Sequence, residues 1–224
     1  MADVGGTERR FGWDPPPRQG WVAPSVAAEF PGLGLAWVEA EGRPGKSPDA
    51  VRRRLDDLSD RFYGSQAIRM RERPIPWAYR VFFRQIGLDP DRTRTPVEQL
   101  AFDRIRDGAF KSRGLPGDAL VIATVETGVG LRAFDADRLE GRLCIRESAP
   151  GESLAGAPGE LAQGTLVLAD ESDPVGLLFG TTAEGYEVEP QSRRFAIVAV
   201  QVGSVPQLSV EEALWMAAAT VESA

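Results

Sequence analysis

The chain has 224 residues, 42% of them hydrophobic, and a formal net charge of −7. That length suits one compact domain, or two small subdomains that share a core. The sequence contains no histidine, no asparagine and one cysteine, Cys144, which excludes imidazole bases, imidazole metal ligands and an internal disulfide. Catalysis would have to use carboxylates, hydroxyls, Arg or Lys side chains, backbone amides or a group of the substrate. We therefore expect no metal site and no cofactor.

The sequence has no run of about 18 apolar residues, so it predicts no membrane-spanning helix. Its first residues, MADVGGTERRFGW, include charges but no apolar segment, and we expect no signal peptide and a cytoplasmic location. Residues 1–45 are rich in proline and glycine and predict an irregular arm, held down by Trp13 and Trp21, with one strand at residues 34–40. Residues 46–224 are expected to form the main domain.

Four helices are predicted from the residues at which they begin and end. Ser47 precedes a proline, and its hydroxyl can cap a free N–H where the proline has none to lose. Thr95 and Glu98 have the spacing of a capping box, and Ser209 begins a similar pattern. Trp77, in the second helix, is expected to face the core. The predicted helices span residues 47–62, 75–86, 95–108 and 209–221.

The second half of the sequence has the patterns of strands. Residues 119–125 (ALVIATV) are a continuous apolar run, as expected for a strand covered on both faces. Residues 142–146 alternate between polar and apolar side chains. Further strands are predicted at residues 165–169, 175–179 and 195–202. Helices followed by strands and one closing helix indicate an α+β fold in which layered, sandwich-like sheets pack with helices.

The charge is distributed unevenly along the chain. Residues 51–113 contain 15 Lys and Arg against 9 Asp and Glu, a balance of +6, whereas residues 114–224 contain 6 against 17, a balance of −11. A polyanion could be held only by the first of these segments. Alternatively, the arginines solvate helix faces and pair with acidic neighbours one turn away.

Three local motifs have a functional and a structural interpretation. Gly128 and Gly130 resemble a dinucleotide-binding turn, but that motif requires a helix directly after it, and an aspartate-rich turn follows instead. Asp135 and Asp137 could bind a cation, although side chains two residues apart in a turn usually bond their own backbone. The acidic residues at 170–173 are interpreted as a solvated loop.

Several short motifs follow one another along about 140 residues of the chain. They are TPVE at 95–98 with Arg104, GLP at 114–116 with Asp118, TG at 127–128, AFDADRLEG at 133–141, Arg146, GE at 151–152, Gly164, AD at 169–170 and FAIVAVQV at 195–202. In this order they resemble the editing and tRNA-binding (B3/B4) domain of the phenylalanyl-tRNA synthetase β subunit, and the free-standing proteins built from it. The resemblance implies a B3/B4-like fold for residues 46–224 and a role in translation quality control, in which the domain binds tRNA and hydrolyses a wrongly attached amino acid from its 3′ end.

The positions that match the polar residues of the family's editing pocket are altered in this chain. Arg132 stands where the family has a histidine directly before Ala-Phe-Asp. The family's asparagine falls near Val121 and its glutamate within residues 196–200, which are apolar here. Because a buried carboxylate or amide needs partners, apolar replacements imply a drier or differently shaped pocket.

Two functions follow from the resemblance and the charge. The first is a free-standing tRNA-binding protein, which could also hydrolyse mischarged aminoacyl-tRNA in trans, as a deacylase that uses positioned water. Its candidate pocket residues are Arg132, Thr124, Glu126, Thr181 and Thr182. Its candidate contacts with the tRNA backbone are Arg80, Arg84, Arg92, Arg94, Lys111 and Arg113. The alternative is a non-catalytic module of the same fold that binds an amino-acid-like small molecule or a protein partner; an unrelated hydrolase is a third reading.

Overall fold

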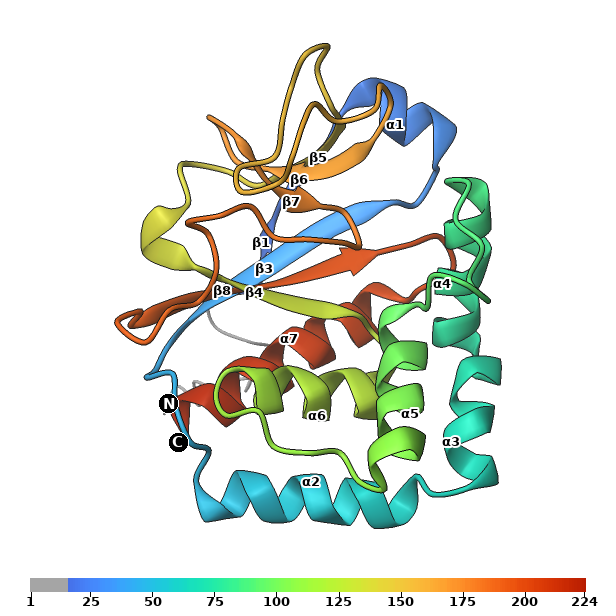
Figure 1. Ribbon diagram of the computed structural model, residues 1–224, viewed down its shortest axis with the longest axis vertical. Coiled ribbons are helices and arrows are strands. Elements are labelled where there is room, and N and C mark those ends of the chain that lie inside the picture. Colours follow the sequence, from blue (N-terminus) through green and yellow to red (C-terminus); the bar gives the residue numbers. More distant parts are fainter. Residues whose placement is uncertain (1–15) are drawn as a thin grey trace, which may run out of the picture.

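The computed structural model describes residues 16–224, which form two four-stranded sheets and seven α-helices (Figure 1). One sheet has the strand order β1-β3-β8-β4 and the other β2-β5-β6-β7. The predicted α+β class is therefore confirmed. Trp13 lies outside the described residues, and Trp21 is 43% exposed.

The first sheet is antiparallel throughout and its two central strands are long. These are β3 (Gly34–Glu41) and β8 (Arg194–Gln201), flanked by β1 (Arg18–Gln19) and β4 (Leu131–Asp135). Most residues of β3 and β8 are buried, as their apolar sequences predict. The strands predicted at residues 34–40 and 195–202 are confirmed, with ends displaced by one residue.

The second sheet lies above the first in Figure 1 and consists of short strands. They are β2 (Trp21–Val22), β5 (Cys144–Glu147), β6 (Leu166–Ala169) and β7 (Pro174–Leu177). β2 pairs in parallel with β5, and the other pairs are antiparallel. The strands predicted at residues 142–146, 165–169 and 175–179 are confirmed with ends displaced by one or two residues.

The helices cover the first sheet and extend away from it. Their bounds are α1 Pro24–Glu29, α2 Asp49–Arg61, α3 Ser65–Arg69, α4 Pro74–Gln85, α5 Pro96–Asp107, α6 Gly117–Thr127 and α7 Gln207–Glu222, with short 3₁₀ turns at Met70–Glu72 and Ala136–Arg138. At the start of α5, the backbone N–H and the hydroxyl of Thr95 donate to Glu98 Oε2 at 3.2 and 2.9 Å, so the predicted capping box is confirmed.

The strand predicted at residues 119–125 is wrong, because this segment is the middle of α6. An apolar run is compatible with a buried strand or a buried helix. Here Ala119 and Ala123 pack into the larger core cluster, while Ile122 and Val125 pack into a second cluster with α2 and α5. A helix enclosed on opposite faces has no polar stripe, so its sequence lacks the helical periodicity that would have identified it.

Four smaller predictions are also corrected. Ser47 does not cap α2; its hydroxyl donates to Asp118 Oδ2 at 2.6 Å and ties α2 to the start of α6. Trp77 is 50% exposed, because the buried face of α4 is formed by other residues. Helix α7 begins at Gln207, two residues before Ser209. Asp170 is 5% exposed and accepts hydrogen bonds from the N–H groups of residues 140, 172 and 173, so it organises its loop.

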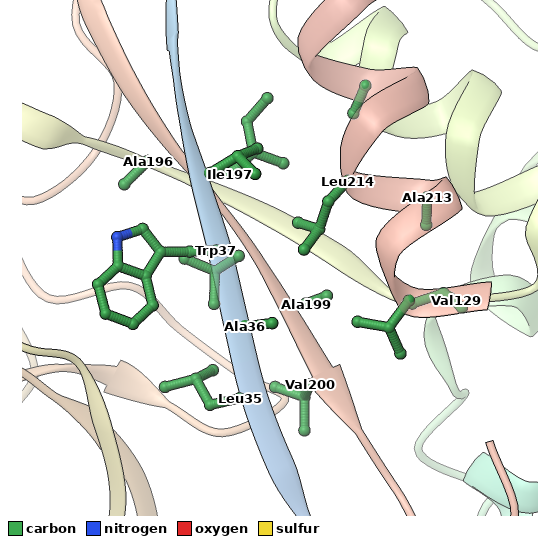
Figure 2. Close-up of a cluster of buried hydrophobic side chains, with 14 of the residues drawn as sticks. Leu35, Ala36, Trp37, Val129, Ala196, Ile197, Ala199, Val200, Ala213 and Leu214 are labelled. Carbon is green, nitrogen blue, oxygen red and sulfur yellow. The ribbon is translucent and has the colours of Figure 1, made fainter. Parts of the chain in front are cut away.

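The main core lies on both faces of the first sheet. Figure 2 shows Ile197 on the side of Leu214 in α7 and Trp37 on the opposite side, as the alternation of side chains along a strand requires. Leu35 shares the face of Trp37, where Leu143 of the segment before β5 also packs. The two sheets therefore meet through apolar side chains. Arg132 of β4 and the segment at the end of β7 also join them.

Candidate functional site

Arg132 connects the two sheets. It lies in β4 opposite Val198 of β8. Its Nη1 donates to the carbonyl oxygen of Leu177 at 2.5 Å, and its Nη2 donates to Oγ1 of Thr182 at 2.8 Å. Its guanidinium carbon is 5.1 Å from the centre of the Phe134 ring, within the range of a cation–π contact. Arg132 thus holds the segment that follows β7 against the first sheet.

The guanidinium of Arg132 has no carboxylate partner among residues 16–224. Burial lowers the pKa of Arg132 to about 10, because loss of water disfavours the charged form. A Cβ atom on Gly176 would lie 3.0 Å from Nη2, so the backbone approaches this side chain closely. Arg132 is therefore a buried hydrogen-bond donor with polar but uncharged partners.

The structure brings three of the five predicted pocket residues together. Thr182 binds Arg132, and the backbone around Thr181 lies against Gly176 in the same cluster. The other two lie elsewhere, because their segment is a helix instead of a strand. Thr124 is 3% exposed in α6, and Glu126 forms an ion pair with Arg61 of α2.

Asp135 and Asp137 form the turn that follows β4. Asp135 Oδ1 accepts the N–H of Asp137 at 3.0 Å, and Asp135 Oδ2 accepts the hydroxyl of Ser192. The structural interpretation of these aspartates is therefore the one that the hydrogen bonds support. In the part of the chain that is described, no group of three or more Cys, Asp or Glu side chains has the arrangement of a metal site.

A pocket of about 580 Å³ adjoins the segment that Arg132 holds. Residues 177–180 form one wall, and the other walls come from the ends of α1 and α4, the segment after α4, and the segments beside β5 and β6. Its apolar lining is Phe30, Ile86, Leu88, Leu166, Leu177, Leu178 and Phe179. Its polar lining is Glu29, Gln85, Thr93, Glu147, Gln163 and Thr165. Sequence reasoning missed this pocket.

Phe179 anchors the wall of the pocket in the core. Its ring centre lies 5.0 Å from that of Phe83 and 5.9 Å from those of Tyr79 and Phe82. The contacts with Tyr79 and Phe82 are edge-to-face and the contact with Phe83 is tilted, and aromatic pairs of this kind stabilise by about 0.5–1.5 kcal/mol each. The wall is thus fixed at one end by aromatic packing and at the other by Arg132, which favours a preformed pocket.

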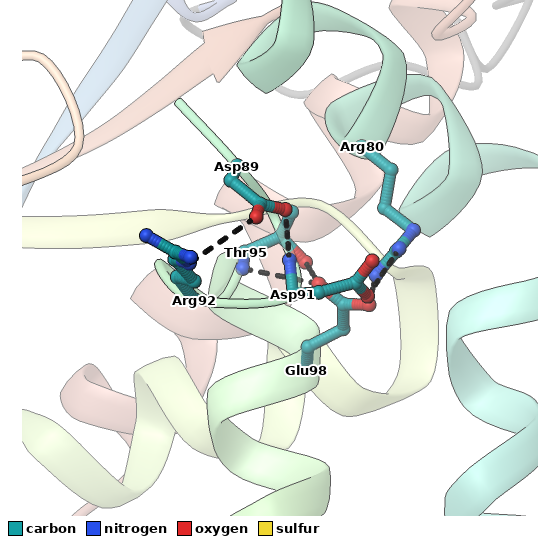
Figure 3. Close-up of polar contacts among 6 residues, drawn as sticks. All are labelled: Arg80, Asp89, Asp91, Arg92, Thr95 and Glu98. Carbon is teal, nitrogen blue, oxygen red and sulfur yellow. Dashed lines mark hydrogen bonds and ion pairs between the residues drawn. The ribbon is translucent and has the colours of Figure 1, made fainter. Parts of the chain in front are cut away.

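The six residues proposed to contact tRNA differ in their availability. Arg80 is 5% exposed and donates to Glu98 and, at 2.7 Å, to Asp91, so its charge is matched within the protein (Figure 3). Arg113 donates to Asp103 at 2.8 Å. Arg113 is nevertheless on the surface, with 60% of its side chain exposed, as are the remaining four residues, Arg84, Arg92, Arg94 and Lys111.

Three of the exposed arginines flank the segment that contributes Thr93 to the pocket. The side chain of Arg92 is 89% exposed, and its Nε lies 3.7 Å from Asp89 (Figure 3). Arg84 lies over the ring of Trp77 at 5.9 Å. Arg94 lies 3.9 Å from the centre of the Phe102 ring. Exposed arginines therefore lie on both sides, in the sequence, of the residues between 85 and 93 that line the pocket.

No protein-family model matches the chain, and no curated protein matches it significantly. Within residues 16–224, no helix has the length and apolar character needed to cross a membrane.

Proposed function

We propose that this protein binds aminoacylated tRNA, with the aminoacyl group in the 580 Å³ pocket. The observation that supports the proposal is the composition of this pocket and its surroundings. Apolar side chains line its interior, and the carboxylates of Glu29 and Glu147 lie on its lining, where they can attract the α-ammonium group of an aminoacyl ester. Exposed Arg84 and Arg92 belong to the segment that forms one wall, where phosphates can be bound.

The proposal agrees with the motif order that resembles the synthetase editing domain, but it assigns a different chemistry to Arg132. A guanidinium donates hydrogen bonds and does not accept protons, so Arg132 cannot replace a histidine as a general base. Its contacts with the last residue of β7 and with the segment after it make Arg132 a positioning residue for the pocket wall. Among the residues that line the pocket, only Glu29 and Glu147 can accept a proton from water, so hydrolysis would depend on them.

The decisive experiment compares one tRNA in two forms, uncharged and with an amide-linked amino acid that cannot be hydrolysed. We expect tighter binding of the aminoacylated form, and weaker binding of both forms as salt rises. Glu147→Gln should reduce the preference for the aminoacylated form without weakening the binding of uncharged tRNA. Glu160→Gln, an exposed residue outside the pocket, is the matched control. Equal affinity for the two forms, or no binding of tRNA, would refute the proposal.

Ester-linked aminoacyl-tRNAs then test hydrolysis. A panel of correctly and incorrectly charged tRNAs is incubated with the protein, and the release of amino acid is compared with the spontaneous rate. Acceleration that is abolished in Glu147→Gln or Glu29→Gln would add deacylation to binding. An unchanged rate across the panel would leave binding as the function and exclude the deacylase.

One observation favours the alternative of a module that binds an amino-acid-like small molecule. Much of the positive charge of residues 51–113 is matched inside the protein, because several arginines there form ion pairs or bind backbone carbonyls. Amino-acid amides, which contain the ammonium group without the tRNA, separate the two functions. Their binding in the absence of any tRNA binding would support the small-molecule module.

A further inference from the structure

A second hollow of the surface, which we call the α3–α5 groove, lies between α3, the turn after it and α5. It has a volume of about 230 Å³ and is lined by Ile68, Phe102 and Ile105, which are 53%, 39% and 52% exposed. Arg71 and Arg94 also line it. Three large apolar side chains exposed side by side are unusual on a protein surface unless they bind something.

The charge of the α3–α5 groove is positive once its internal pairs are considered. Arg80 lies at the groove and binds both Glu98 and Asp91, so these three side chains together have a net charge of −1 (Figure 3). Arg71 makes no ion pair or hydrogen bond with any of residues 16–224, although its charge acts on the nearby Asp91, and Arg94 lies over the ring of Phe102. Three arginines against two carboxylates give the lining of the groove a net charge of +1, and the exposed Arg71 and Arg94 lie beside its apolar surface.

We propose that the α3–α5 groove binds an unpaired nucleotide of an RNA strand. This inference rests on the proposed function, because it takes RNA as the partner. The site it assigns is distinct from the 580 Å³ pocket proposed to hold the aminoacyl group. The base would stack on Phe102 and the guanidinium of Arg94, which already lies 3.9 Å from the ring centre. Ile68 and Ile105 would flank the base, and Arg71 would bind a phosphate.

The size of the groove favours a nucleotide over a peptide helix. An amphipathic helix binds through anchors spread over two or more turns and needs a long apolar groove. The α3–α5 groove has less than half the volume of the aminoacyl pocket, and its apolar side chains form one cluster. Aromatic rings paired with guanidinium groups are the surfaces on which bases stack. An RNA base therefore fits both the dimensions and the chemistry.

The test uses a short fluorescein-labelled single-stranded RNA without an aminoacyl group, titrated with the full-length protein. Phe102→Leu keeps an apolar side chain but removes the aromatic face, and we expect it to weaken binding by at least about fivefold. Arg71→Gln should lower the slope of log affinity against log salt by about 0.7, whereas Phe102→Leu should leave the slope unchanged. Leu208→Ala on α7 and Arg53→Gln on α2 are matched exposed controls.

The outcomes separate this site from the aminoacyl pocket. Losses confined to the groove variants support the proposal, whatever the preference for an aminoacyl group proves to be. Unchanged RNA binding in Phe102→Leu and Arg71→Gln would overturn it, and so would the absence of RNA binding by the wild-type protein. Binding of an acidic peptide that is lost in Phe102→Leu, without RNA binding, would also overturn it and identify a protein-docking groove.

Discussion

Replacing Arg80 by methionine removes a buried cation while keeping most of the apolar length of the side chain. Arg80 is 5% exposed and donates to Glu98, which is 8% exposed, and to the exposed Asp91. In the variant the carboxylate of Glu98 stays buried without its cation. Removing one partner of a buried ion pair costs about 3–5 kcal/mol in the free energy of unfolding.

The lower end of that range applies here for two reasons. Glu98 Oε2 keeps its hydrogen bonds from the N–H and hydroxyl of Thr95, so the carboxylate is not left bare. In addition, Nε of Arg80 is buried without a partner, and its removal relieves a small cost. We therefore expect Arg80→Met to lower the free energy of unfolding by about 3 kcal/mol.

Urea denaturation of the wild type and the variants, followed by far-UV circular dichroism, measures this loss. Arg84→Met, one turn along α4 at an exposed position, is the control and should change stability by less than about 0.5 kcal/mol. In the double variant Arg80→Met/Glu98→Gln no buried charge is uncompensated, so the loss should be smaller than the sum of the single losses. A loss below about 1 kcal/mol for Arg80→Met, or strict additivity, would refute the reasoning.

Three further predictions concern stability and can be measured by the same denaturation assay. Tyr79→Phe should cost about 1–3 kcal/mol, because the buried hydroxyl donates to a β8 carbonyl oxygen at 2.6 Å and accepts the N–H of Gly130 at 3.2 Å; an unchanged midpoint would contradict this. Gly130→Ala should cost about 1–3 kcal/mol, because a Cβ atom there would lie 2.7 Å from Pro96 Cγ; wild-type stability would show that the helix start can shift freely. Arg146 lowers the pKa of Glu152 below its ordinary value of 4.5, so the pair stabilises the fold above that pH and the stabilisation is lost as the pH falls through the lowered value. The cost of Glu152→Gln should therefore be largest near neutral pH and shrink in acid, and a cost independent of pH would exclude the pair as its cause.

The helices and strands that the sequence predicted correctly are those whose signal lies in residues close together along the chain. The capping box of Thr95 and Glu98 lies within four residues, and it fixed the start of α5 correctly. The alternating or apolar runs of β3, β5 and β8 are likewise local patterns. Ser47 shows the limit of such reasoning, because a cap and a tertiary hydrogen bond use the same hydroxyl, and only the position of Asp118 decides between them.

The candidate site was predictable only in part because its pieces are distant in the sequence. Glu29, Thr93 and Glu147 line one pocket although they belong to three separate segments, and none of them has a neighbour that signals binding. Arg132 was identifiable because the motif around it resembles a known pattern. Its partner Thr182 lies 50 positions away, and their hydrogen bond depends on the way β7 turns back toward β4.

Arg132 also shows how one side chain can fix the shape of a site without taking part in proton transfer. A guanidinium reaches further than an imidazole and offers donors in a fixed fork, so it can bind a carbonyl oxygen and a hydroxyl at once. In this protein those two acceptors belong to the segment whose residues 177–180 line the pocket. Replacing Arg132 should therefore alter the pocket by releasing its wall, and the proton transfers of any hydrolysis would have to come from Glu29 and Glu147. Under the proposed function, the pocket would bind the aminoacyl group whether or not the protein hydrolyses the ester.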